Sequence, residues 1–144
     1  MKFWDSSAVV PLLVEEESSA RLLDLYAGEE AVLVWWSTSV ECTSALARLE
    51  RSSHLSPGET RAALGRLDSL EETWDVVEPT PRLARSAKRL LRTHELRAAD
   101  SLQLAAALLA AEGEPASLPF VCLDERLCVA ADREGLDVFG RERL

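Results

Sequence analysis

Two kinds of segment alternate along the whole chain. Short apolar runs, rich in β-branched and aromatic residues, are separated by longer stretches in which apolar residues recur at helical spacing. Continuous apolar runs of this kind are typical of strands that are covered on both faces, as in parallel sheets. The runs predict strands at residues 2–5, 31–36, 76–77, 119–123 and 136–138.

The stretches between the runs predict helices. Ser56 can cap one of them, with Pro57 in the first helical position and Glu59 in the capping-box position. Gly28 and Gly135 mark the ends of two others. The predicted helices span residues 7–14, 16–26, 39–53, 57–73, 81–93, 98–111 and 125–134.

This alternation of strands and helices predicts an α/β protein. The expected architecture is a three-layer α/β/α sandwich with a mostly parallel central sheet. The sequence contains no linker, internal repeat or low-complexity tract, and 144 residues suit one domain with a sizeable core. We therefore expect a single domain over residues 1–144.

Composition narrows the class of protein. Hydrophobic residues make up 47% of the chain and charged residues 28%, which is ordinary for a soluble globular protein. A charge at Asp5 interrupts the first apolar run far short of a signal sequence, and no apolar stretch could span a bilayer. The three cysteines lack the CxxC spacing of a zinc site. These features favour a cytoplasmic protein with free thiols and no membrane partner.

Four carboxylates stand at the junctions between predicted strands and helices. Asp5 and Asp124 each end an apolar run. Glu41 lies in the first turns of the helix after the second run, and Asp100 begins a helix that is almost entirely apolar. Because strand carboxyl ends and helix amino ends share one edge of a parallel sheet, we expect the four side chains to meet there.

A group of carboxylates points to a particular chemistry. Gathered negative charges repel one another unless a cation lies among them, and oxygen ligands without His or Cys favour Mg²⁺ or Mn²⁺. Such an ion can generate a hydroxide nucleophile and stabilise phosphoryl transfer. Each acid also has an ordinary alternative role: a helix cap for Asp5, a helix-dipole acid for Glu41, a cap or a partner of Arg97 for Asp100, and a turn for Asp124.

Four segments carry a recognisable pattern: Asp5–Ala8, Glu41 after a Ser/Thr-rich turn, residues 96–107 and residues 120–138. In order and spacing, over the whole chain, they resemble the PIN-domain family, and in particular the VapC-type toxins of bacterial toxin–antitoxin pairs. Two positions depart from the family pattern. Cys122 stands where Thr or Ser is usual, and Gln103 stands where many relatives have His, a position that affects packing or substrate contact.

The resemblance implies the PIN α/β/α sandwich and a metal-dependent ribonuclease, a phosphodiester hydrolase that uses Mg²⁺ or Mn²⁺. It also implies a cognate antitoxin that neutralises the toxin, and a homodimer. By the same resemblance, the catalytic and metal-binding residues are Asp5, Glu41, Asp100 and Asp124. Ser7 is then a supporting polar group beside them.

RNA binding requires positive charge, whereas the net charge of the chain is −9. The helix predicted over residues 81–93 places arginines on one face, and Arg97 follows it. This face is either a solvated amphipathic surface or a contact for RNA or an antitoxin. Its arginines are Arg82, Arg85, Arg89 and Arg92.

Two other classes of enzyme require residues that the chain does not have in the necessary places. A haloacid-dehalogenase-like phosphatase requires a second aspartate two residues after the first, and Ser7 occupies that place. A receiver domain requires a lysine after a late strand, and neither Lys2 nor Lys88 is placed there. The remaining alternative is a catalytically silent PIN scaffold that binds RNA or a protein partner without cutting.

Overall fold

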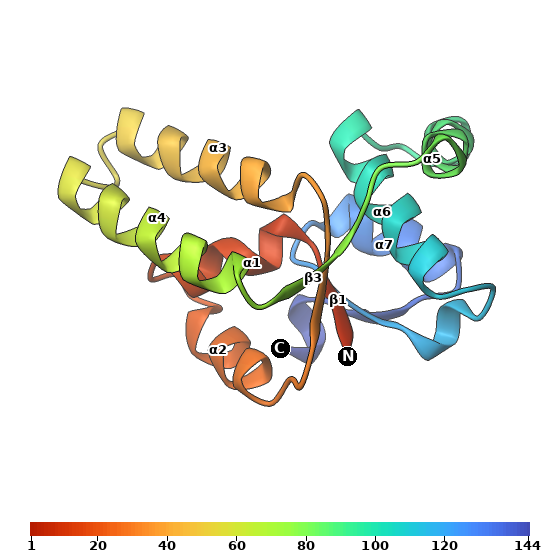
Figure 1. Cartoon of the computed structure of the whole chain (residues 1–144), viewed down its shortest axis with the longest axis horizontal. Helices are drawn as coiled ribbons and strands as arrows, with labels where there is room; N and C mark the ends of the chain where they lie inside the picture. The colour runs from red at the N-terminus through yellow and green to blue at the C-terminus, as the bar shows by residue number, and fades with distance from the viewer.

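The computed structural model describes residues 1–144 and contains a parallel five-stranded sheet between two layers of helices (Figure 1). The strands lie in the order β3-β2-β1-β4-β5, and every neighbouring pair is parallel. This arrangement confirms the predicted fold class. The strands are β1 (Lys2–Trp4), β2 (Val32–Trp35), β3 (Trp74–Val77), β4 (Pro119–Val121) and β5 (Asp137–Phe139).

Helices cover both faces of the sheet (Figure 1). One layer contains α1 (Ser6–Leu13), α2 (Ser19–Ala27), α3 (Thr38–Arg51) and α4 (Pro57–Glu71). The other contains α5 (Pro81–Thr93), α6 (Ala98–Ala110) and α7 (Glu125–Arg133). Two short 3₁₀ turns, η1 (Pro115–Ser117) and η2 (Arg141–Arg143), complete the chain. No helix is long and apolar enough to cross a membrane.

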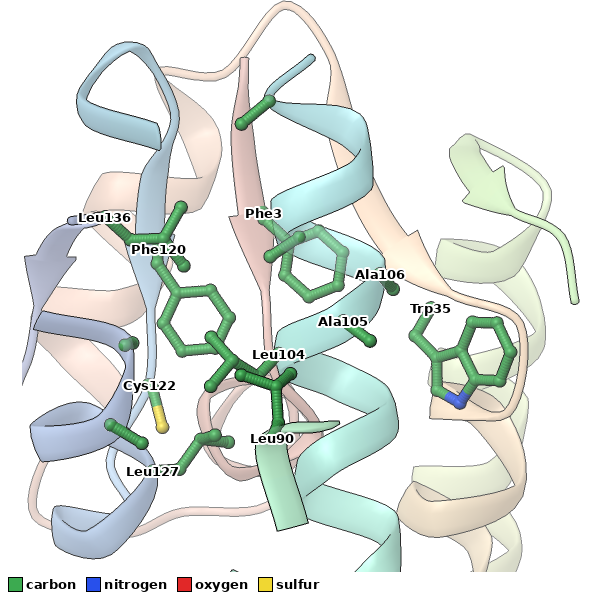
Figure 2. Packing of buried hydrophobic residues seen from close by; sticks show 14 of the residues in the cluster. Phe3, Trp35, Leu90, Leu104, Ala105, Ala106, Phe120, Cys122, Leu127 and Leu136 are labelled. Carbon is green, nitrogen blue, oxygen red and sulfur yellow. The ribbon is translucent and has the colours of Figure 1, made fainter. Parts of the chain in front are cut away.

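Alternate residues of the central strands face opposite layers, as the two-residue period of a strand requires. In β1, Phe3 belongs to the core beneath α5–α7, whereas Trp4 belongs to the core beneath α1–α4. Phe3 stacks on Phe120 of β4 with ring centroids 5.6 Å apart. Figure 2 shows Leu90 and Leu104 closing over these rings from α5 and α6. Because both faces are buried, the strands lack the polar alternation of a solvated sheet.

The order of the strands creates a site at the carboxyl edge of the sheet. From β1 the chain moves outward to β2 and β3, and it later returns to the other side of β1 as β4 and β5. Ligands of open α/β sheets bind where the strand order reverses in this way, here between β1 and β4. The register pairs Trp4 with Val121, and the Asp5 N–H donates to the Val121 carbonyl at 3.0 Å.

Some element ends differ from the prediction. Helix α2 begins at Ser19, three residues later than predicted. The Ser19 hydroxyl accepts from the Glu16 N–H at 2.8 Å and donates to the Val14 carbonyl at 3.0 Å, so the preceding residues form a turn. Strand β3 begins at Trp74, two residues earlier than predicted, because Trp74 pairs with Val32 of β2.

Candidate active site

The four predicted carboxylates line one cavity of about 780 Å³ at the carboxyl edge of the sheet, which we call the carboxylate cavity. Asp5 follows β1, Glu41 lies in the first turn of α3, Asp100 lies in the first turn of α6, and Asp124 precedes α7. Residues up to 119 positions apart in the sequence therefore line the same cavity. The predicted supporting residue, Ser7, lines the same cavity.

Asp5 is the buried member of the set, with 3% of its surface exposed. It caps α1, and its Oδ2 accepts hydrogen bonds from the Ser7 hydroxyl at 2.5 Å and from the Ser7 N–H at 3.0 Å. Burial raises the pKa of Asp5 to about 6 against the lowering effect of these hydrogen bonds. The charges of Glu41 and Asp100 raise it slightly further.

Ser7 connects the segments that follow β1 and β4 at the cavity. Its hydroxyl donates to Asp5 and accepts from the Leu123 N–H at 2.9 Å. Leu123 lies between β4 and Asp124, so one side chain fixes the end of β1 against the segment that carries the last acid. Ser7 therefore lies beside Asp5, and its role as a supporting residue of the site stays a prediction.

Cys122 supports Asp5 from the side of β4. Its thiol lies 3.6 Å from Asp5 Oδ2, to which it donates, and 3.6 Å from the Ser7 hydroxyl. Cys122 is completely buried, and burial raises the pKa of its thiol well above the usual value, so the group stays protonated and serves as a donor. The residue that departs from the family pattern therefore contacts the first acid directly.

Glu41 is held by three side chains. Ser37 donates to it at 2.8 Å, Ser6 at 3.1 Å, and the Gln103 amide at 3.2 Å. Gln103 is completely buried in α6 and donates also to the Thr38 hydroxyl at 3.1 Å. The sequence suggested packing or substrate contact for Gln103. The structure shows that it is buried and positions Glu41.

Asp100 and Asp124 lie on the open side of the carboxylate cavity. Asp100 accepts from the Arg97 N–H at 3.3 Å, and Asp124 caps α7 by accepting from the Leu127 N–H at 3.0 Å. Burial raises the pKa of Asp100, and the Asp124 charge adds to the effect against the Arg97 hydrogen bond. Asp100 and Asp124 therefore both cap a helix and line the cavity.

The donor chemistry of the cavity fits a hard divalent cation. The acidic residues that line the cavity are the four predicted carboxylates and Glu125, and no histidine lines it. Repulsion between the carboxylates adds to burial in raising the pKa values of Asp5 and Asp100. A bound cation would relieve this repulsion. In their present positions, no three His, Cys, Asp or Glu side chains are close enough together to hold a metal ion.

Arginines also line the carboxylate cavity, and the sequence analysis singled out only Arg97 among them. Arg48 lies seven residues after Glu41 and so on the same face of α3, a spacing that could have revealed it. The other two are Arg126 and Arg141. The predicted basic face of α5 does not line the cavity, and its Arg89 pairs with Glu134 at 2.6 Å.

Comparisons with known proteins identify the family of the chain. A sequence profile of the PIN domain matches residues 2–132. The chain belongs to the PIN-domain family. This PIN-domain chain is 33% identical over 136 residues to "Ribonuclease VapC45" of Mycobacterium tuberculosis (strain CDC 1551 / Oshkosh), a match that covers 94% of the chain and 92% of the relative.

Solved structures show the same fold for this PIN domain. FitAcB from Neisseria gonorrhoeae is similar over 100% of both chains, with a TM-score of 0.73 and 19% identity. A toxin-antitoxin complex from Klebsiella pneumoniae is similar over 96% of both chains, with a TM-score of 0.64 and 15% identity. The family resemblance found in the sequence is confirmed.

Proposed function

We propose that this PIN-domain protein is a VapC-type endoribonuclease that hydrolyses RNA phosphodiester bonds in the carboxylate cavity. The observation that carries the proposal is that Asp5, Glu41, Asp100 and Asp124, from four separate segments, line one cavity at the switch point of the sheet. The name of the 33% identical relative, a ribonuclease, supports RNA as the substrate.

In this proposal the four acids hold Mg²⁺ or Mn²⁺. When bound, such an ion supplies a polarised water and neutralises charge that develops on the scissile phosphate. Ser7 and Cys122 fix the orientation of Asp5, and Gln103 fixes that of Glu41. These residues keep two ligands in position before the ion enters, which lowers the cost of arranging them.

A cognate antitoxin is the proposed partner, and a second copy of the chain completes the proposed assembly. The similarity to a toxin-antitoxin complex supports the first of these partners. The alternative is a catalytically silent scaffold that binds RNA or a protein without cutting. The complete set of four acids at one cavity favours the enzyme, because a binding surface alone has no need of gathered carboxylates.

The test is cleavage of a mixed RNA pool by the purified protein in Mg²⁺, in Mn²⁺ and in EDTA. Asp5→Asn removes one cavity carboxylate with little change of shape, and Asp68→Asn makes the same change at an exposed position of α4. We expect metal-dependent cleavage that Asp5→Asn abolishes and Asp68→Asn retains. Cleavage that survives in EDTA, or that persists in Asp5→Asn, would contradict the assignment.

A further inference from the structure

Four arginines from four segments surround the mouth of the carboxylate cavity, and we call them the arginine rim. Their side chains are exposed, whereas Asp5 lies buried at the bottom of the same cavity. The rim consists of Arg48 in α3, Arg97 directly before α6, Arg126 in the first turn of α7, and Arg141 in η2.

The guanidinium groups of the rim form few close ion pairs within the protein, although the charges of Arg97 and Arg126 lower the pKa of Asp100 against the effect of burial. Arg48, Arg97 and Arg141 form no ion pair within 4.0 Å, although carboxylates line the same cavity. Arg126 has one partner, Glu95, at 3.8 Å, and both side chains are more than half exposed. Charges so exposed contribute little to stability, so these arginines remain available to an anion from outside.

The segment that carries Arg141 is fixed on both sides. After it, Arg143 pairs with Asp137 at 2.6 Å and lies 3.7 Å from the centre of the Phe139 ring. Before it, Gly140 lies against α7, where a Cβ added at this position would be in ordinary van der Waals contact with the Cys128 sulfur at 3.4 Å. These contacts hold the last turn of the chain, and with it Arg141, against the cavity.

The basic face of α5 is a weaker candidate for contacting a ligand of the cavity. None of its arginines lines the cavity. Arg89, in the middle of that face, is already paired with Glu134, which also contacts His94 at 3.1 Å. Arg82, Arg85 and Arg92 are exposed, but the charge of Arg89 between them is neutralised by Glu134.

We propose that the arginine rim is the binding site for the RNA backbone, where guanidinium groups bind phosphates on either side of the phosphate that enters the cavity. The identity of the ligand as RNA rests on the proposed function. A phosphate that approaches a carboxylate-lined cavity is repelled, and the chain as a whole carries a net charge of −9. Local positive charge at the mouth offsets this repulsion, and the planar guanidinium matches phosphate geometry with two parallel hydrogen bonds.

The experiment compares two triple variants in an Asp5→Asn background, which we expect to bind RNA without cutting it. The rim variant is Arg48→Gln/Arg97→Gln/Arg141→Gln. The control is Arg82→Gln/Arg85→Gln/Arg92→Gln on α5, which removes the same number of charges from exposed positions. Binding of a fluorescent single-stranded RNA pool is measured by anisotropy over a range of salt concentrations.

The slope of log affinity against log salt is negative, and each lost contact with a single-stranded phosphate reduces its magnitude by about 0.7. We therefore expect the slope of the rim variant to become shallower by about 2, and that of the control to remain unchanged. An unchanged slope in the rim variant, or an equal fall in the control, would overturn the proposal. So would an Asp5→Asn protein that binds no RNA.

These results are separate from those that test the proposed function, because binding is measured without cleavage. A wild-type protein that cuts no RNA in any metal but binds RNA through the rim would refute the nuclease and leave the rim assignment intact. A protein that cuts RNA, but whose RNA binding keeps the same salt dependence after loss of the rim, would support the nuclease and refute the rim assignment.

Discussion

The bottom of the carboxylate cavity and its arginine rim are built in opposite ways. At the bottom, Asp5, Ser7 and Glu41 line the cavity, and the buried side chains of Gln103 and Cys122 support them from behind through hydrogen bonds. We call these five residues the cavity floor. The rim has exposed guanidinium groups with almost no partners. The floor is therefore set by the fold, whereas the rim is free to respond to a ligand.

This difference separates two kinds of requirement. Catalytic ligands must be held within a narrow range of positions, and supporting hydrogen bonds provide that restraint. Contacts to a nucleic-acid backbone instead need positive charge near the phosphates. Each contact contributes to the affinity without requiring a strict geometry. Substitutions in the floor should therefore alter stability and the reaction together, and substitutions in the rim should alter binding alone.

The largest expected effect on stability comes from the buried charge of Asp5. A pKa raised from 3.8 to about 6 means that the folded state favours the protonated acid. Stability due to this group is present below pH 3.8, declines as the pH rises towards 6, and is fully lost above it, a change of about 3 kcal/mol. Urea unfolding in EDTA at several pH values measures it.

Asp5→Asn removes this decline because the amide cannot ionise. Between pH 3.8 and a pH above 6, we expect the free energy of unfolding of the variant to rise by about 3 kcal/mol relative to that of the wild type, with both proteins in EDTA. Asp68→Asn, at an exposed position, serves as the control and should follow the wild type. A constant difference between Asp5→Asn and wild type across this range would show that Asp5 is not held as a buried acid.

The next effect concerns Gln103, which positions Glu41 from inside the core. Gln103→Leu keeps the volume and removes the hydrogen bonds to Glu41 and Thr38. We expect roughly a 10- to 100-fold loss of metal affinity or cleavage, the range found when such supporting groups are removed. The measurement is Mn²⁺ titration of the variant beside single-turnover cleavage.

Rescue distinguishes positioning from simple disruption of the core. Gln103→His restores a donor at this position, and we expect it to recover most of the lost metal affinity. The contrary result is that the two variants unfold at the same urea concentration and still bind Mn²⁺ equally weakly. That result would show that Gln103 does not support metal binding through its hydrogen bond to Glu41.

A smaller effect is expected at Cys122, because a thiol is a weak donor. Cys122→Ser replaces it with a stronger donor near Asp5 and should lower the pKa of Asp5, whereas Cys122→Ala should raise it. The change in free energy is about 1 kcal/mol or less, the usual net value of one hydrogen bond. Carboxyl titration by NMR gives the direction, and equal pKa values in the two variants would place the thiol outside the support of Asp5.

The smallest effect on stability is expected at the rim. Arg48, Arg97 and Arg141 are exposed and have no ion-pair partner within 4.0 Å, so each replacement with Gln should change the free energy of unfolding by no more than about 0.5 kcal/mol, and the triple variant by no more than about 1.5 kcal/mol. Urea unfolding of the triple variant checks this. A loss of several kcal/mol would show that the arginines stabilise the cavity and would contradict their separation from the floor.

The fold was predictable because its signals are local. Apolar runs around Phe3, Val34 and Phe120 each form a strand, and helices follow at the predicted places. Errors fell at ends that depend on contacts elsewhere, such as the start of β3, which is set by pairing with β2. The single domain over residues 1–144 and the homodimer stay predictions.

The candidate acids were also locally marked, since each stands where an apolar run ends or a helix begins. The residues around them were not. Gln103 meets Glu41 across 62 positions, and Ser7 meets Leu123 across 116, so only the folded chain reveals these contacts. Arg141 lies in a terminal segment without periodicity, whereas Arg48 could have been found from its spacing to Glu41. The catalytic roles of the four acids remain a proposal.

Single-turnover cleavage of RNA over a range of protein concentrations tests the division between floor and rim most directly. It yields a maximal rate, which reports the chemistry, and a half-saturating concentration, which reports RNA binding. The two proteins compared with wild type are Asp5→Asn and the rim triple variant.

For Asp5→Asn we expect the maximal rate to fall by about 10³-fold or more, because several kcal/mol of metal-dependent stabilisation is lost. For the rim variant we expect a half-saturating concentration about tenfold higher or more, with a maximal rate within a few-fold of wild type. A rim variant that loses its maximal rate at unchanged half-saturation, or an Asp5→Asn protein that keeps its rate, would contradict the account.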